Sequence, residues 1–325
     1  MKILLDVHAH LIPLREQDLA GLTDVQWLPS GRLMVDGAQL PKRELYEPEA
    51  LIRWMDSNGV AQAWVSVPPT LYRAALEADD ARQWAMALNA GLSRISAAAP
   101  QRIAALHHLP VQHPQAAAQV AAHSVAAGQQ GFAMPAGDAQ RARMLSDPQY
   151  EPLWQTLDGA GAFVLLHPHR SCDPRLDSLS LSNLLGGPTE TAIAAAHLAM
   201  SGVLERHSRI RFCLAHGGGT TAAVGGRLQR GQDTERPGAY LGGEKVRQAM
   251  KRFCVDCITH DAASLEFVAG FFGQDRVLFG SDWPFDMGLP KPHEQLSELP
   301  AALRQKIFQD NPKAIMTSGM AGTHE

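Results

Sequence analysis

Eight short apolar runs along the chain alternate with longer segments whose apolar residues recur at helical spacing. The runs are Ile3–Val7, Ala61–Val67, Ile103–Leu109, Gly131–Met134, Phe163–Leu166, Ile210–Ala215, Phe253–Ile258 and Val277–Phe279. The helical segments include Pro48–Asn58, Ala81–Ala99, Pro114–Ala127, Thr189–His207 and Ala262–Phe272. Runs that are apolar almost throughout are typical of parallel strands covered on both faces. Strands and helices that alternate in this way predict an α/β fold, a (β/α)8 barrel of the TIM type.

A doubly wound open sheet is the alternative architecture for the same alternation. The nucleotide-binding version of that fold carries Gly-X-Gly-X-X-Gly after its first strand, and this chain has no such motif there. We therefore expect one barrel domain over residues 1–315 and a weakly structured tail over residues 316–325.

Residues 11–47 do not fit the repeating pattern. The segment is long, contains prolines and glycines throughout, and has one short apolar stretch, Leu33–Val35, that could form an edge of a small hairpin. An insertion after the first strand of a barrel lies on the face where the strands end, and barrel enzymes build their active sites there. We expect this segment to act as a lid or substrate loop.

Polar side chains that suit metal binding follow four of the predicted strands: His8 and His10, His167, His216 and Asp282. His8 and His10 are two residues apart on a strand, so their side chains point the same way. The carboxyl ends of barrel strands share one rim. Three imidazoles and a carboxylate are ligands that zinc or a similar divalent ion accepts, with a position left for water or substrate. Asp282 could bind the metal or accept a proton from its water, and His216 could act as an acid/base or as an electrophile.

Other histidines near the strand ends are less clear. His169 would project like His167, but Pro168 should end the strand, so His167 is the better placed ligand. His107 and His108 end the third run, and we expect structural roles for them. His260 follows the seventh run and could contact a substrate.

Composition narrows the function classes. The chain has 325 residues, 45% of them hydrophobic and 19% charged, with a formal net charge of −4. This composition is ordinary for a globular protein, and the chain carries no basic block that suggests nucleic acid. After Met1 and Lys2 only Ile3–Leu5 precede Asp6, which is too short for the apolar core of a signal peptide, and no apolar run is long enough to cross a membrane. We therefore expect a cytoplasmic location.

The four cysteines are Cys172, Cys213, Cys254 and Cys257, which we expect to be reduced. Cys254 and Cys257 have the spacing of a redox or zinc pair. They lie within a predicted strand, however, and no second pair follows. We interpret them as buried structural thiols.

As a set, Asp6–His10, His167-Pro168, His216–Gly219 and Gly280–Phe285 resemble the amidohydrolase superfamily. Within it they are similar to the branch of aminocarboxymuconate semialdehyde decarboxylase and related metal-dependent decarboxylases. The resemblance implies a (β/α)8 barrel with one zinc or manganese ion. It assigns the metal to His8, His10, His167 and Asp282, and catalysis to His216 beside the metal. Superfamily members with two metals usually carry a carbamylated lysine on the fourth strand, and Gly131–Met134 contains no lysine.

The resemblance also implies how a substrate is held. Relatives bind substrate carboxylates with arginines, one of which reaches into the neighbouring subunit; Arg227 matches it in spacing, which implies a homodimer. Lys42 or Arg43 matches a second basic position, although each could equally be a solvated surface charge. His169 stands where relatives often have tryptophan, and Asp286–Gly288 replace a Pro-Leu-Gly-type segment. We expect His169 and Trp283 to contact the substrate.

These observations favour a non-oxidative, metal-dependent decarboxylase that acts on a small carboxylated aromatic or muconate-type acid. Loss of carbon dioxide leaves a carbanion that must be stabilised and protonated, and His216 and Asp282 are the candidates for proton handling. The alternative is a hydrolase or hydratase that uses metal-bound water on a lactone or an aromatic ring-cleavage product. A barrel that only binds small ligands is a third hypothesis, and the presence of both His216 and Asp282 argues against it.

Overall fold

The eight predicted apolar runs all contain parallel strands. The computed structural model describes residues 1–40, 42–137, 143–169, 171–239 and 244–317. The strands in these runs are β1 Ile3–His10, β5 Val60–Ser66, β6 Ile103–Ala105 with β7 His107–His108, β8 Gly131–Pro135, β9 Phe163–His167, β10 Arg211–Leu214, β11 Cys254–Asp256 and β12 Val277–Leu278. The prediction of strand positions is confirmed.

The strands form two parallel sheets that follow one another around the molecule. One sheet has the order β1-β5-β6 and the other has the order β12-β11-β10-β9-β8-β7. A single residue, Leu106, separates β6 from β7. Beyond β12, the backbone N–H of Val7 donates to the carbonyl of Phe279 at 2.9 Å, and Ala9 forms a parallel bridge with Trp283. Backbone contacts therefore link the end of the second sheet to β1.

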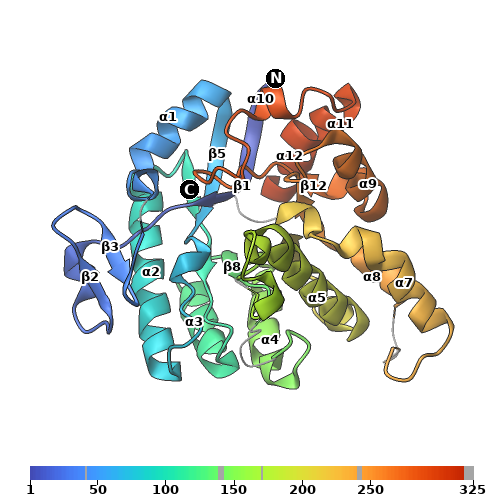
Figure 1. Cartoon of the computed structure of the whole chain (residues 1–325), viewed down its shortest axis with the longest axis horizontal. Helices are drawn as coiled ribbons and strands as arrows, with labels where there is room; N and C mark the ends of the chain where they lie inside the picture. The colour runs from blue at the N-terminus through green and yellow to red at the C-terminus, as the bar shows by residue number, and fades with distance from the viewer. Residues whose placement is uncertain (41, 138–142, 170, 240–243, 318–325) are drawn as a thin grey trace.

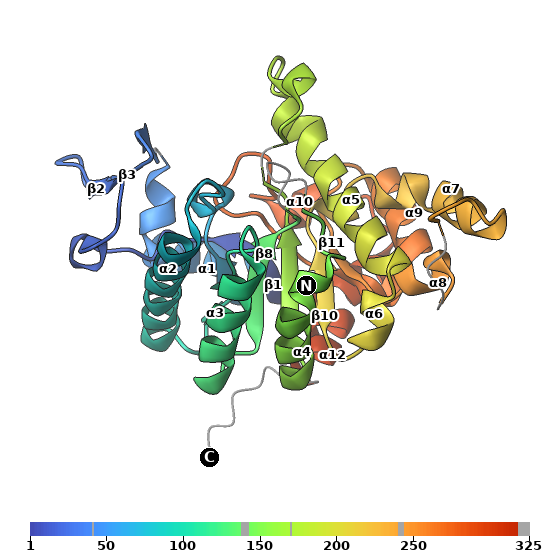
Figure 2. The ribbon, with the colours of Figure 1, turned by 90° about the horizontal axis from the view of Figure 1, so that it is seen from below.

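Helices lie outside the strands (Figures 1 and 2). They are α1 Pro48–Asn58, α2 Ala78–Ala98, α3 Pro114–Ala126, α4 Glu151–Ala160, α5 Gly187–Met200, α6 Val203–Arg206, α7 Thr221–Asp233, α8 Val246–Met250, α9 Ala262–Phe272, α10 Pro292–Gln295, α11 Ala301–Gln305 and α12 Asn311–Thr317. The predicted bounds of α1 and α9 are confirmed to the residue. The segment Thr189–His207 contains two helices, α5 and α6. No bounds were predicted for α4, α7, α8 or α10–α12.

Residues 11–47 carry a small antiparallel sheet of β2 Val25–Trp27, β3 Leu33–Val35 and β4 Ala38–Gln39. It lies at the side of the molecule beside α1 and α2 (Figures 1 and 2). The buried guanidinium of Arg73 pairs with Asp36 at 2.5 Å and ties the sheet to the body. The predicted hairpin edge at Leu33–Val35 is confirmed as a strand.

Helix α12 extends two residues into the predicted tail. Met316 and Thr317 still belong to α12, and Ile315 is buried. The remaining residues of the predicted tail, 318–325, lie outside the described residues. Within the described ranges, we find no helix with the length and apolarity that a membrane crossing requires.

Cys213, Cys254 and Cys257 are buried free thiols, whereas Cys172 is exposed. Burial raises the pKa of Cys213, Cys254 and Cys257. Because these thiols stay protonated and out of solvent, they are poor nucleophiles and poor metal ligands. The prediction that Cys254 and Cys257 are buried thiols is confirmed.

Candidate metal site

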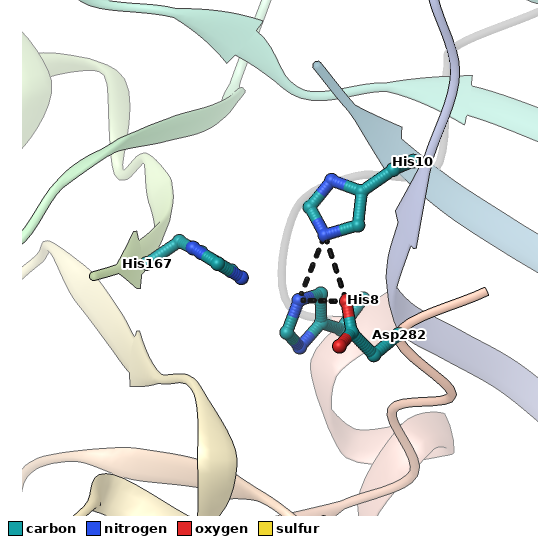
Figure 3. A group of neighbouring side chains, drawn as sticks. All are labelled: His8, His10, His167 and Asp282. Atoms are coloured by element: carbon teal, nitrogen blue, oxygen red, sulfur yellow. Dashed lines mark hydrogen bonds and ion pairs between the residues drawn. The ribbon is translucent and has the colours of Figure 1, made fainter. Parts of the chain in front are cut away.

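Four buried side chains from three parts of the sequence converge at the carboxyl ends of the strands (Figure 3). His8 and His10 come from the end of β1, His167 ends β9, and Asp282 follows β12. Each offers one potential ligand atom, and these atoms all lie within 4.8 Å of one another. This is the set that the strand ends predicted.

The hydrogen bonds of His8 and His10 fix which ring nitrogen faces the cluster. His8 Nδ1 lies 2.7 Å from a carboxylate oxygen of Asp256, and His10 Nδ1 lies 3.2 Å from the carbonyl oxygen of Val67. Since a carboxylate and a carbonyl only accept hydrogen bonds, both Nδ1 atoms carry the proton. In the neutral rings, each Nε2 atom then presents a lone pair to the cluster.

His167 presents its lone pair in the same way. Its Nδ1 lies 2.9 Å from the carbonyl oxygen of Pro168, which again places the proton on Nδ1. Its buried Nε2 has no hydrogen-bond partner among the described residues. Leaving a buried polar atom unpaired costs about 1–3 kcal/mol, so we expect this atom to bind a partner other than a protein hydrogen-bond donor, such as a metal ion.

The convergence of these atoms is unfavourable unless a positive charge sits among them. His8 Nε2 and His10 Nε2 face each other at 3.1 Å, and an Asp282 carboxylate oxygen lies 3.0 Å from His10 Nε2 and 3.4 Å from His8 Nε2. Burial opposes protonation of His8, but the bond to Asp256 and the charge of Asp282 outweigh it and raise the pKa of His8. Three imidazole nitrogens and one carboxylate fit a divalent cation.

Asp256 organises the site, although we did not identify it from the sequence. One carboxylate oxygen accepts from His8 Nδ1 and from the backbone N–H of His216, and the other accepts from the N–H of Gly217 at 2.8 Å. Burial works against ionisation, but these hydrogen bonds and the nearby histidines lower the pKa of Asp256. A carboxylate that orients a metal-binding histidine also makes its ring more basic. The signal was present, because Asp256 is a charged residue inside an apolar run.

Hydrogen bonds to Asp6 hold the loop that carries Asp282. The Asp6 carboxylate accepts from the hydroxyl of Ser281 at 2.5 Å and from its backbone N–H at 3.0 Å. Burial raises the pKa of Asp6 to about 7, although these hydrogen bonds oppose the rise. Gly280 lets the loop approach, because a Cβ atom there would lie 2.8 Å from the Cβ of Asp256 and 2.9 Å from that of His8.

His216 stands beside the cluster rather than within it. Its Nε2 lies 3.8 Å from the second carboxylate oxygen of Asp282, and its ring centre is 5.0 Å from that of His167. The residue has a left-handed φ of 55°, a conformation that is unusual for a residue other than glycine and that clusters at functional sites. His216 is thus placed to exchange a proton with a group bound at the cluster.

A cavity of about 380 Å³ opens from His216 and Asp282 towards the surface. Most of its described lining is apolar, and its mouth is formed by partly exposed Leu184, Phe267 and Met287. The remaining described lining residues are Asn183, Pro188, Gly219, Thr220, Ala222, Ala223, Ile258, Thr259, His260, Ser264 and Val268. A cavity whose lining is mostly apolar and includes some polar groups is typical of a small-molecule site.

The structure separates the other histidines of the third and fifth strands. His107 binds Ser93 Oγ and Ser124 Oγ, both at 2.9 Å, on the helical side of the strand. His108 points the other way, and its ring stacks on Tyr72 with centres 5.1 Å apart. Burial lowers the pKa of His107 to about 4 and that of His108 to about 3. His169 contacts Tyr72 rather than the converging ligand atoms.

The basic residues expected to bind substrate are not among the described residues that line the cavity. Lys42 pairs with Asp286 at 2.6 Å, and Arg43 pairs with Glu47 at 2.7 Å on the surface. Arg227 is exposed on α7, and no ion pair joins it to a carboxylate of the described residues. Trp283 is buried, and its backbone bonds to β1.

The chain is similar to known proteins along almost its whole length. A family model described as amidohydrolase matches residues 5–316. The 2-amino-3-carboxymuconate-6-semialdehyde decarboxylase of Dictyostelium discoideum is 26% identical and covers 98% of this chain and 90% of its own length. The gamma-resorcylate decarboxylase of Rhizobium radiobacter is 28% identical, and the match covers 76% of this chain and 80% of that protein. The structure of a dihydroxybenzoic acid decarboxylase from Polaromonas, solved with manganese and 2-nitroresorcinol, matches with a TM-score of 0.80 at 21% identity. This match covers 98% of this chain and 97% of that one.

Proposed function

Because the chain belongs to the amidohydrolase family, we propose that it is a metal-dependent carboxy-lyase that removes carbon dioxide without an oxidant. The substrate would be a small carboxylated aromatic or muconate-type acid. The observation that carries the proposal is the convergence of His8, His10, His167 and Asp282 beside an uncoordinated histidine, His216. Two relatives that match most of their own length carry the names of decarboxylases that act on such acids. These names do not favour hydrolysis or hydration, the alternative weighed from the sequence.

We assign one divalent metal ion to His8, His10, His167 and Asp282. Zinc is our first choice because imidazole nitrogens and a single carboxylate suit it. Manganese is the second choice, and it is the ion named for two structural relatives. When bound, the ion would neutralise negative charge that develops on a substrate oxygen.

The residues around this centre would supply the proton. When the carbon–carboxylate bond breaks and carbon dioxide leaves, the bonding electron pair stays on the substrate carbon, which must then take a proton. His216 Nε2 would deliver that proton, and Asp282 beside it would stabilise the charged imidazole. The apolar walls of the cavity would exclude water from the substrate and so strengthen these electrostatic interactions.

We extend the proposal to the fold around the site. We infer that the eight parallel strands close into a (β/α)8 barrel, and the bond from Val7 to Phe279 and the bridge from Ala9 to Trp283 support closure. Residues 11–47 would be an insertion after β1, with Lys42 and Asp286 joining it to the loop that follows Asp282. A single domain over residues 1–315 and a cytoplasmic location remain proposals as well.

We expect the metal-loaded protein to release carbon dioxide from at least one acid of a panel containing hydroxybenzoates, benzenedicarboxylates and muconates. The measurement is carbon dioxide release with identification of the product by mass spectrometry. The control is protein stripped of metal with a chelator, which should be inactive until the ion is restored. Water added across a lactone or a double bond of a panel member, with no loss of carbon dioxide, would overturn the proposal in favour of the hydrolase or hydratase.

We also propose that the protein works as a homodimer. Arg227 is exposed on α7, and it is not among the described residues that line the cavity within one chain. Large apolar side chains are exposed nearby, namely Leu184, Leu185, Ile193 and Val224. Figure 2 shows the beginning of α5 projecting from the body of the molecule. Exposed apolar patches of this kind support association, and a second copy could bring Arg227 to the substrate.

We expect Arg227→Ala and His216→Ala, each nearly inactive alone, to regain activity when the two variants are mixed. One hybrid dimer site would combine an intact His216 with an intact Arg227 of the other chain. The measurement is activity after subunit exchange, with exchange followed separately by mass spectrometry. The control is Arg230→Ala, one turn further along the same helix, which should not need rescue. Exchange without recovered activity would show that Arg227 does not act across an interface.

A further inference from the structure

We propose that His260 is a specificity-determining residue that recognises a hydroxyl substituent of the substrate at the outer part of the cavity. The inference rests on the proposed function and adds to it a substrate class, namely acids that carry a hydroxyl group away from the carboxylate that is lost. It is drawn from the position, backbone conformation and unused hydrogen-bonding capacity of His260.

His260 lies on the loop between β11 and α9, and it lines the same cavity as His216 and Asp282. Asp282 is buried at the inner end, whereas His260 is exposed towards the mouth. The walls between them include Ile258 and Val268, both buried and apolar. A ring that fills this space would therefore have its reacting carboxylate at one end and His260 at the other.

The backbone of His260 is held in an unfavourable conformation. Its φ is 67°, in the left-handed region where glycine or asparagine would be less strained. Its imidazole makes no hydrogen bond or ion pair with any described residue; the adjacent Asp261 carboxylate instead caps α9 by accepting from the N–H of Ser264. A strained residue with a free polar side chain at a cavity is a sign of a functional role.

The neighbours of His260 define the substituent that it can recognise. An imidazole with one proton offers one donor and one acceptor, and the Ser264 hydroxyl beside it offers both. Thr259 Oγ1 donates to the carbonyl of Asp261 at 3.2 Å, so its lone pairs remain to accept. A hydroxyl group both donates and accepts, and it can satisfy this mixed set. A second carboxylate only accepts, so it would leave the acceptor atoms of this set unpaired.

The test compares His260→Gly and His260→Asn with wild type, because both replacements tolerate the left-handed backbone. The probes are 2-hydroxybenzoate, its 2,3-, 2,4- and 2,5-dihydroxy counterparts, and isophthalate, titrated calorimetrically into the zinc-loaded protein. His123→Ala, which removes an exposed histidine of α3 outside the cavity, is the matched control. Unfolding temperatures should stay within a few degrees of wild type, since no hydrogen bond within the protein is lost.

We expect wild type and His123→Ala to bind one dihydroxy isomer about 10-fold more tightly than 2-hydroxybenzoate, and His260→Gly to lose that preference while binding 2-hydroxybenzoate unchanged. An equal preference with and without His260 would overturn the inference and leave the proposed function standing. Stronger selection for isophthalate through His260 would overturn the hydroxyl assignment. If wild type neither binds nor decarboxylates any of these acids, the proposed function fails, and the inference fails with it.

Discussion

His216→Ala is expected to keep its bound metal and to lose decarboxylase activity by roughly 10²-fold or more. The Nε2 atom of His216 is 3.8 Å from Asp282, and it does not belong to the group of converging ligand atoms. Its backbone is held by Asp256 independently of the side chain. Removing the imidazole should therefore abolish proton delivery while leaving the four proposed ligands in place.

Metal content, by atomic emission on purified protein, and turnover would be measured on the same sample. Because His216 has a φ of 55°, alanine there keeps the backbone strain of that conformation, about 1–2 kcal/mol, without the imidazole. His216→Asn is the matched control, since asparagine accepts the left-handed conformation but does not transfer protons. Both variants should show the same loss of activity. A folded variant that has lost its metal would instead make His216 a ligand.

The strands could be predicted because a buried strand shows itself as a short apolar run in the sequence. Each predicted run is apolar over four or more residues or ends at a polar strand terminus, and both patterns are legible without tertiary information. Helix α7 shows the opposite case, because it contains Gly225 and Gly226, which lower helix propensity and weaken its signal in the sequence. A Cβ atom at Gly225 would lie 2.2 Å from the ring of Phe271. Packing against α9 thus requires the residue that obscures the helix in the sequence.

The candidate metal ligands could also be predicted, because each lies at or just after the end of a strand and parallel strands end on one side of a sheet. Asp256 could not be identified in the same way, since the sequence does not reveal that its carboxylate accepts from four donors. The Cys254–Cys257 spacing drew attention to the wrong residues of that run. Lys42 shows a further limit, because its ion pair with Asp286 joins residues 244 positions apart. Such contacts depend on the fold and not on local pattern.

His167→Ala is expected to lose both the metal and the activity, whereas His169→Ala is expected to keep the metal. The two histidines are separated only by Pro168, and the sequence alone left open which of them is the ligand. The geometry separates them: His167 Nε2 is buried, lacks a hydrogen-bond partner and points at His8 and His10, while the His169 ring lies against Tyr72.

The variants His167→Ala and His169→Ala test the site by the metal content of the protein as well as by its activity. Wild type should contain one equivalent of zinc or manganese, His169→Ala the same, and His167→Ala less than about one tenth of that at equal metal supply, because loss of one ligand of four removes much of the binding energy. Circular dichroism would show whether His167→Ala is folded. His167→Gln, of similar volume and without an imidazole, controls for the cavity that alanine leaves. Two equivalents in wild type would contradict a single site. Metal retained by His167→Ala but lost by His169→Ala would exchange the two roles, and it would mean that the unpaired nitrogen of His167 marks something other than a ligand.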